Sequence, residues 1–180
     1  MKRLIQILLA IIVTTNASLA QKDNGEWHRV KTDHGIAFTM PENPTQNVTT
    51  QDGIPTYIYQ CRDLSCVFGV VCADFNDKKE MLQPEYMGSL VELLKAGSAP
   101  KEEYGKIVAE RLVQRQNPLI YEIKYTTEKD KVQWSYIKQF IITDRYIYQF
   151  NIGAKSRNTE QLQYEADLFF NSITYNEEKN

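Results

Sequence analysis

The sequence predicts an α+β domain built on an antiparallel sheet. Strand-like and helical runs are segregated along the chain, in the order strands, helix, strands, helix. A parallel sheet would instead need strands and helices in alternation. Each of the two helical runs has one apolar face, so each helix is expected to cover a surface of the sheet.

Four strand-like runs precede the first helix, in two pairs: 27–32 with 35–40, and 56–61 with 66–75. Asp33-His34-Gly35 is a turn signal of the hairpin type. Pro41 ends the second run, because proline cannot donate to a β-ladder. The polar segment 45–53 is expected to be a loop, and 62–65 is expected to be a four-residue hairpin loop.

The first helix is expected at 84–96, because Pro84 suits a first helical turn and Gly97 suits the residue after the end. Its apolar face combines residues at helical spacing: Tyr86, Leu90, Leu93 and Leu94.

Four further strand-like runs follow: 106–116, 119–127, 132–143 and 146–153. The run 106–116 also fits a helix. In 119–127 apolar and aromatic residues alternate with Glu122 and Lys124, which places these two charges on one side of a strand. The closing helix is expected at 159–173, with a buried stripe of Leu162, Ala166, Phe169 and Ile173.

The first twenty residues predict export. Lys2 and Arg3 precede an apolar stretch at 4–13, and Ser18 and Ala20 supply the small residues of a cleavage site, the pattern of a secretory signal peptide. The stretch is about 10 residues, whereas a membrane span needs roughly 20. We therefore expect a signal peptide at 1–20 and a single domain at 21–180, periplasmic or secreted. Since no cysteine follows the cleavage point, we expect a soluble protein without a lipid anchor.

Charge limits the class of partner. Loss of Lys2 and Arg3 with the signal takes the formal net charge from −2 to −4. A nucleic-acid partner would need a clustered basic face, and docking on anionic lipid would need a basic patch. We therefore expect neither a nucleic-acid partner nor electrostatic attachment to a membrane.

The three cysteines are Cys61, Cys66 and Cys72. Export allows a disulfide, and an odd count leaves at least one thiol outside an internal pair. If 61 and 66 lay opposite each other across the loop 62–65, their Cβ atoms would be roughly 4.5–5.5 Å apart. We therefore predict a disulfide between Cys61 and Cys66. Cys72 is expected to be a buried, inert thiol.

Residues that could carry catalysis are sparse. A thiol enzyme would need a base beside Cys72, yet the two histidines, His28 and His34, lie far away in sequence. These histidines also lack a third ligand at a zinc-binding spacing. The chain has no phosphate-binding loop, no G-x-S-x-G and no H-E-x-x-H motif. The sequence thus predicts no catalytic residue, no metal site and no cofactor.

Aromatic residues offer the one candidate binding surface. Two adjacent strand-like runs each carry three on one face: Trp134, Tyr136 and Phe140, then Tyr146, Tyr148 and Phe150. Such rings can form a stacking platform for a sugar or peptide, or a core beneath a helix. We expect most of them to be core. Trp134, near the turn at 128–131, is the residue predicted to be partly exposed and to bind.

Three segments carry a resemblance to a known family: 27–30 with 35–41 (WHRV, GIAFTMP), 140–150 (FIITDRYIYQF) and 169–173 (FFNSI). They resemble the opening hairpin, the paired late strands and the terminal helix of PsbP-like domains, a group that also contains DcrB-like envelope lipoproteins. The resemblance implies an α/β/α sandwich with a central antiparallel sheet and two main helices. It also implies an adaptor or binding protein, since the group includes an extrinsic photosystem II protein and a Ran-binding import factor.

Two departures limit what carries over. The chain lacks the lipid-modified cysteine of the DcrB-like lipoproteins, and no residue matches a metal-binding or Ran-binding position of the family. The predicted function is non-enzymatic binding of another protein or an envelope component. The alternative is a carrier of a small apolar ligand in a pocket between sheet and helix, and a hydrolase is the third possibility.

Overall fold

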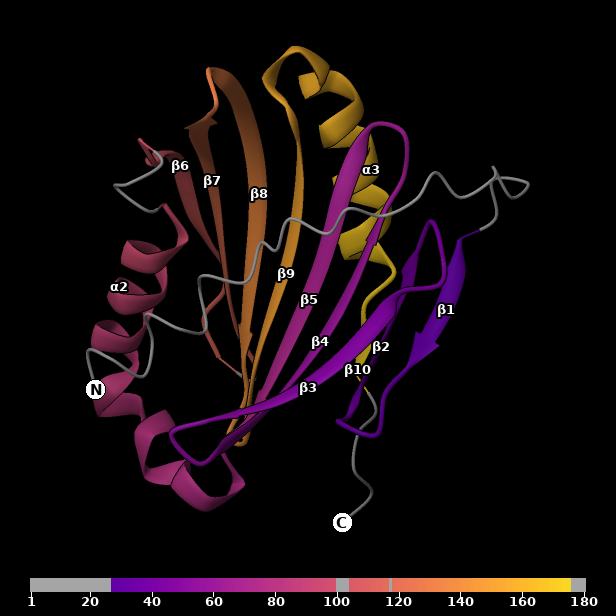
Figure 1. The fold of residues 1–180 in the computed structure, drawn as a ribbon. Helices are drawn as coiled ribbons and strands as arrows, with labels where there is room; N and C mark the ends of the chain where they lie inside the picture. The colour runs from indigo at the N-terminus through magenta and orange to yellow at the C-terminus, as the bar shows by residue number, and fades with distance from the viewer. Residues whose placement is uncertain (1–26, 100–103, 117, 176–180) are drawn as a thin grey trace.

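The computed structural model describes residues 27–99, 104–116 and 118–175 (Figure 1). The predicted signal peptide at 1–20, its cleavage site after Ala20 and the start at Gln21 lie outside the described residues. None of the helices among the described residues is both long enough and apolar enough to cross a membrane.

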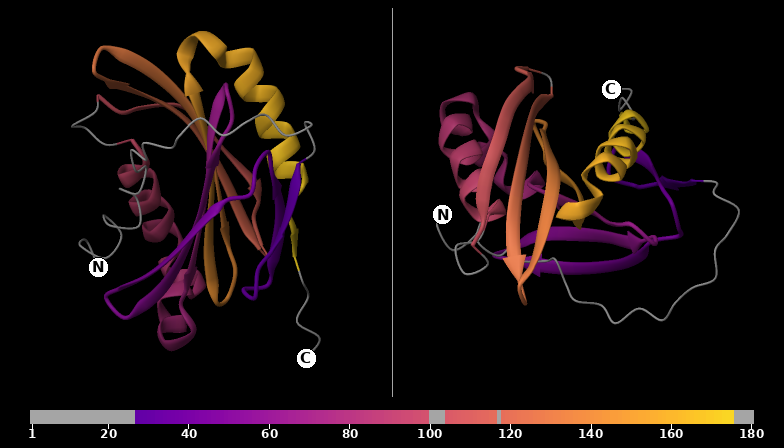
Figure 2. Two further views of the ribbon diagram at one scale, coloured as in Figure 1. Left: turned by 45° about the vertical axis from the view of Figure 1, so that its right-hand side comes forward. Right: turned by 90° about the horizontal axis from the view of Figure 1, so that it is seen from above.

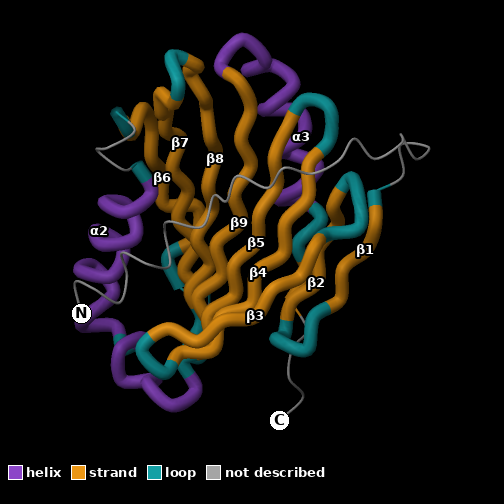
Figure 3. The backbone as a smooth tube through the Cα atoms, viewed as in Figure 1, coloured by secondary structure: helices purple, strands orange, loops and turns teal. Residues whose placement is uncertain are grey.

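The main layer is an antiparallel sheet of seven strands (Figures 1 and 3). In spatial order these are β3 (Thr45–Gln51), β4 (Ile54–Arg62), β5 (Cys66–Asp74), β9 (Tyr146–Lys155), β8 (Val132–Ile142), β7 (Leu119–Lys129) and β6 (Lys106–Gln114). Two runs of consecutive hairpins, β3 to β5 and β6 to β9, are joined where β5 pairs with β9. Among the described strands, β3 and β6 therefore lie at the two ends of this sheet, and each has one edge that pairs with no described strand.

A small second sheet contains β1 (His28–Lys31), β2 (Ile36–Met40) and β10 (Thr174–Tyr175), with β2 in the middle. Arg29 fastens the end of the chain to this sheet: its guanidinium donates to the carbonyl of Ser172 at 2.8 Å and to the hydroxyl of Thr174. Ser172 in turn accepts a hydrogen bond from the Thr39 amide at 2.9 Å. These contacts position the short strand β10, which the sequence pattern does not predict.

Two helices lie on opposite faces of the large sheet (Figure 2). They are α2 (Met87–Ser98), preceded by the 3-10 segments η1 (Asn76–Leu82) and η2 (Pro84–Tyr86), and α3 (Thr159–Asn171), preceded by η4 (Ser156–Asn158). The small sheet lies on the same side as α3 (Figure 2). This arrangement confirms the predicted α+β class, with an antiparallel sheet between two main helices.

Phe169 is the centre of the core beneath α3. It is 0% exposed, and its ring centroid lies 5.4 Å from that of Phe68, 5.6 Å from Phe150 and 6.5 Å from Phe38. Phe68 and Phe150 belong to the large sheet and Phe38 to the small one. One side chain therefore joins α3 to both sheets through edge-to-face ring contacts, which stabilise beyond simple burial.

The opposite core lies between the large sheet and α2. Leu90 and Leu94 of α2, with Phe75 and Leu82 just before the helix, pack on a sheet surface that includes Phe140. Each face of the sheet thus has its own apolar cluster, as expected for a three-layer domain.

Several predicted boundaries are wrong. Residues 45–51 are a strand, not a loop, because β3 is an exposed edge strand and so lacks an alternating apolar pattern. Helix α2 begins at Met87 and continues through Gly97, and α3 ends at Asn171, so Ile173 lies beyond it. The run that also fitted a helix is the strand β6.

The predicted disulfide between Cys61 and Cys66 is also wrong. The register pairs Cys61 with Phe68, and all three cysteines are free. The physical reason is the turn: the Asp63 carboxylate accepts hydrogen bonds from the amides of Ser65 and Cys66 at 2.7 and 2.6 Å, and the Asp63 amide donates to the carbonyl of Cys66 at 3.0 Å. The loop is therefore shorter than expected. Cys72 is fully buried, as predicted, and burial raises the pKa of its thiol.

Gly153 supplies a sharp test of the packing. A Cβ atom there would lie 2.2 Å from the ring of Tyr136, and that ring is stacked on Tyr125 with centroids 4.9 Å apart. We predict that Gly153→Ala lowers the free energy of unfolding by about 1–3 kcal/mol, the usual effect of overpacking. Gly69→Ala is the control, because a Cβ there meets nothing within 4 Å. Equal denaturant midpoints for the two variants would contradict the packing.

Candidate functional site

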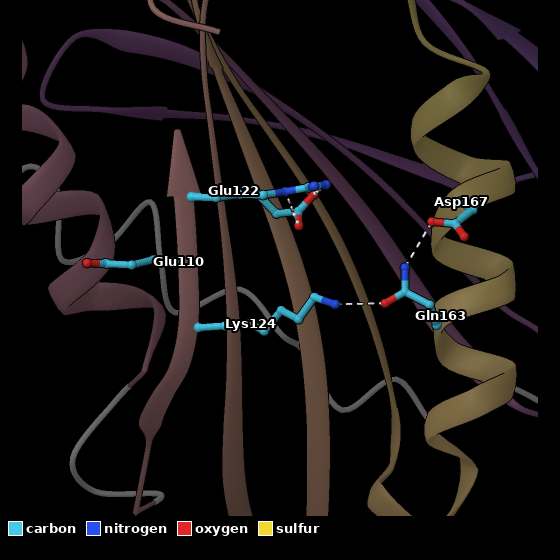
Figure 4. A pocket seen from close by; sticks show the side chains of 7 residues that line it. Glu110, Glu122, Lys124, Gln163 and Asp167 are labelled. Carbon is cyan, nitrogen blue, oxygen red and sulfur yellow. Dashed lines mark hydrogen bonds and ion pairs between the residues drawn. The ribbon is translucent and has the colours of Figure 1, made fainter. Parts of the chain in front are cut away.

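Helix α3 packs on β9, β8 and β2. Beside it, a cavity of about 340 Å³ lies between α3 and the last two strands of the sheet, β6 and β7 (Figure 4). Its lining is almost entirely charged or polar: Ala109, Glu110, Arg111, Glu122, Lys124, Gln163 and Asp167. The alternation predicted for β7 is correct, since Glu122 and Lys124 both lie on this side of the strand.

Glu122 and Arg111, which both line the cavity, form an ion pair with each other. They are directly opposite in the β6–β7 register, and the carboxylate accepts from both Nε and Nη2 of Arg111 at 3.0 Å. The side chain of Glu122 is 6% exposed, whereas that of Arg111 is 67% exposed. The carboxylate raises the pKa of Arg111. A buried carboxylate needs such a partner, and here the guanidinium of Arg111 balances the negative charge of Glu122.

A second polar chain crosses the cavity from β7 to α3 (Figure 4). The Lys124 ammonium donates to Oε1 of Gln163 at 2.8 Å, and Nε2 of Gln163 donates to Oδ1 of Asp167 at 2.9 Å. Gln163 and Asp167 are four residues apart and therefore lie on the same side of α3. The amide of Gln163 thus separates a cation on the sheet from an anion on the helix.

Glu110 lines the cavity from the backbone, because its side chain points the other way, toward α2 (Figure 4). There its carboxylate forms an ion pair with Lys95 at 2.7 Å, and Lys95 also pairs with Glu92 at 3.0 Å. These carboxylates raise the pKa of Lys95. The contact ties β6 to α2 across the open end of the sheet.

The outer edge of β6 pairs with no other strand of the described ranges, and the strand is apolar in part. Three side chains on this strand are exposed although they are large and apolar: Val108 (55%), Leu112 (43%) and Val113 (47%). The pairing with β7 is irregular on either side of the Glu110–Arg111 dipeptide, with register shifts between Ile107 and Ala109 and between Leu112 and Gln114. An open strand edge of this kind is a ready template for pairing with another chain.

The residues that line the cavity include no histidine, no cysteine and no side chain with a hydroxyl group. Within the described ranges, moreover, no three residues among His, Cys, Asp and Glu are grouped so that they could hold a metal ion. What the cavity offers is two cations, two anions and an amide, a set suited to recognising polar groups by hydrogen bonds.

The aromatic residues singled out by sequence lie elsewhere. Trp134 is half-buried on the α2 side of β8, and its ring stacks near that of Tyr136 with centroids 6.2 Å apart. Tyr136 and Phe140 are buried beside it, and Tyr146, Tyr148 and Phe150 are buried on the opposite face. The expectation that most of these rings are core is confirmed. The binding role of Trp134 stays a prediction.

The two histidines are far from the cavity, at the small sheet. His28 lies in β1, and His34 lies in the β1–β2 turn, where its ring stacks on Tyr57 with centroids 3.6 Å apart. Burial lowers the pKa of His34. Its carbonyl accepts a hydrogen bond from the hydroxyl of Tyr148 at 2.5 Å, so the turn is fastened to the large sheet.

Lys138 is a buried amine that sequence reasoning missed. It is 5% exposed on the α2 side of β8, and Nζ donates to the hydroxyl of Ser98 at 3.2 Å. Nζ also lies 5.6 Å from the ring centroid of Tyr125 and 5.8 Å from that of Phe140. Among the described residues no carboxylate is within ion-pair distance of it. Burial lowers the pKa of Lys138 to about 7.

We predict that Lys138 makes stability rise with pH between about 7 and 10.5, because in that window the unfolded chain holds a proton that the folded chain has released. Lys138→Met should raise the free energy of unfolding at pH 6–7 by about 1–4 kcal/mol and flatten this rise. Urea titrations across the pH range measure both effects. The exposed Lys155→Met is the control, and an unchanged slope in Lys138→Met would contradict the assignment.

No protein-family model matches the chain, and a search of curated proteins finds no match. Among solved structures, the chain is similar to cyanobacterial PsbP (CyanoP) from Synechocystis sp. PCC 6803, with a TM-score of 0.60 and 13% sequence identity over 89% of this chain and 98% of that one. The predicted resemblance to PsbP-like domains is therefore confirmed at the level of fold.

Two further solved structures have lower TM-scores. One is PA94 of Pseudomonas aeruginosa, a protein of unknown function (TM-score 0.44, 7% identity, 79% of this chain and 92% of that one). The other is LpqN of Mycobacterium tuberculosis, involved in cell envelope biogenesis (TM-score 0.42, 12% identity, 84% of this chain and 91% of that one).

Proposed function

We propose that this chain is an exported, non-catalytic domain that binds another protein or an envelope component through the open edge of β6. The observation that carries the proposal is an edge of β6 that pairs with no described strand, combined with three exposed apolar residues, Val108, Leu112 and Val113. A partner segment in extended conformation can add to such an edge through main-chain hydrogen bonds, while apolar side chains add contact area.

The chemistry of the cavity beside β6 favours binding over catalysis. Its ionised groups are held by one another or by the Gln163 amide, in contacts of 2.8–3.0 Å. An acid–base or nucleophilic mechanism would need a group poised next to its base with a pKa near the working pH. Export is proposed from the sequence of residues 1–20.

A carrier of small apolar ligands is less well supported. Such sites are lined mostly by apolar and aromatic side chains. The described cavity between sheet and helix has Ala109 as its one apolar lining residue. Dye displacement with an apolar fluorophore measures this alternative directly, and saturable binding of the dye would favour it.

The edge of β6 can be tested against the other edge of the same sheet. Leu112→Lys places a charge on β6, and Val48→Lys places one on β3, where Val48 is 57% exposed. A lysine on an edge strand opposes strand addition. We predict that a partner captured from the envelope or secreted fraction by the mature chain binds at least tenfold more weakly to Leu112→Lys and equally well to Val48→Lys.

The result for Leu112→Lys decides the proposal. Equal retention by both variants, each with an unchanged melting temperature, would exclude the β6 edge as the binding surface. Loss from the β3 variant alone would move the surface to the opposite end of the sheet.

A second surface surrounds Trp134 and the β7–β8 turn, which was predicted at 128–131 and comprises residues 130–131 in the structure; the half-buried ring lies near the start of β8. Aromatic rings are enriched at binding hot spots. If this surface is used, Trp134→Ala should weaken partner binding by about 1–2 kcal/mol. The free energy of unfolding of Trp134→Ala should fall by less than the roughly 3–5 kcal/mol that removing a fully buried tryptophan side chain costs. Unchanged affinity beside a lowered melting temperature would assign Trp134 to the core.

A further inference from the structure

The cavity between β7 and α3 holds two opposite charges that do not pair with each other. Lys124 donates to Gln163, and Asp167 accepts from Gln163. Within the described part of the chain, no ion pair joins Lys124 or Asp167 to any other residue. The ammonium has three N–H donors and the carboxylate has two acceptor oxygens, so each keeps capacity beyond this single hydrogen bond.

The Gln163 amide occupies the position that a small ligand would take. It presents a carbonyl oxygen to the cation and an N–H to the anion, and Figure 4 shows it lying between the two. Gln163 is exposed and long, so its side chain can turn away into solvent without leaving a void in the core. The amide is thus a weak, neutral substitute for a ligand that carries both charges.

We propose that this cavity binds a small zwitterion, an α-amino acid, in place of the Gln163 amide. The ligand carboxylate accepts from Nζ of Lys124, and the ligand ammonium donates to the carboxylate of Asp167. Both contacts are hydrogen bonds between two ionised groups. They are stronger than the bonds that they replace, in which one ionised group is paired with the neutral Gln163 amide.

The balance of charge in the lining selects this class of ligand. Arg111 and Glu122 pair at 3.0 Å, and the charge of Asp167 also acts on Arg111. Among the described residues, Lys124 and Asp167 are the cation and the anion of the lining that form no ion pair, and they lie on opposite walls. A simple anion or a simple cation would satisfy one wall and leave the other charge unmatched. A sugar would gain from an aromatic ring to stack on, and none lines the cavity. The volume of about 340 Å³ lies at the small end of ligand sites.

This inference is independent of the proposed function, because it concerns a free small molecule and the inner wall of the cavity instead of the outer edge of β6. Loss of partner binding in Leu112→Lys would therefore say nothing against the binding of an amino acid in the cavity.

The test is calorimetric titration of the mature chain with glycine, L-alanine and L-glutamine, beside acetate and ethylammonium as singly charged probes. We expect saturable binding of at least one α-amino acid, at least tenfold tighter than either singly charged probe. Lys124→Met and Asp167→Asn should each weaken that binding about tenfold or more, since each removes one charge-assisted contact.

Gln163 provides the decisive variant. Because its amide competes with the ligand, Gln163→Ala should tighten binding about threefold or more. Gln161→Ala is the matched control: it lies on the same helix, is exposed and bonds to Glu165 outside the cavity, so binding should be unchanged. No binding of any of the three amino acids, equal binding of acetate, or weaker binding by Gln163→Ala would each overturn the proposal. Thermal melts of every variant confirm that the fold is retained.

Discussion

The position of α3 depends on one buried ring, that of Phe169, and the rest of this face follows from it. Its contacts with Phe68, Phe150 and Phe38 place the helix above the middle strands of the large sheet and beside the small one. A single helix covers only part of a seven-stranded sheet, and α3 packs on β8 and β9, so the outer strands β6 and β7 lie to one side of it. The polar cavity lies between this helix and the outer strands, and the edge of β6 that pairs with no described strand lies beyond the cavity.

The strand β7 shows how one sheet serves two environments. On one side Ile123 and Tyr125 are buried in the core beneath α2, and on the other Glu122 and Lys124 face the cavity. A charged residue is tolerated at these two positions because Arg111 and Gln163 supply hydrogen-bond partners there. Among the described residues Lys138, on the α2 side of the neighbouring strand, has no such anion, and burial lowers the pKa of its ammonium.

The sequence predicted the class, both helices and the alternation of β7, because these follow from local periodicity. It did not predict β3, since a polar edge strand shows no apolar alternation, nor the turn at Asp63, whose side-chain hydrogen bonds displaced the Cys61–Cys66 pairing. The cavity could not be predicted from the sequence for a different reason. Arg111, Glu122 and Gln163 come from three elements, and only the tertiary fold brings them together.

Amide hydrogen exchange of the mature chain, alone and saturated with its captured partner, tests the central claim most directly. Added strands protect the backbone amides of the edge that they join. The account predicts new protection concentrated in Lys106–Gln114, with little change in Thr45–Gln51. Protection confined to Thr45–Gln51, or to the start of β8 around Trp134, with the amides of Lys106–Gln114 unchanged, would contradict it.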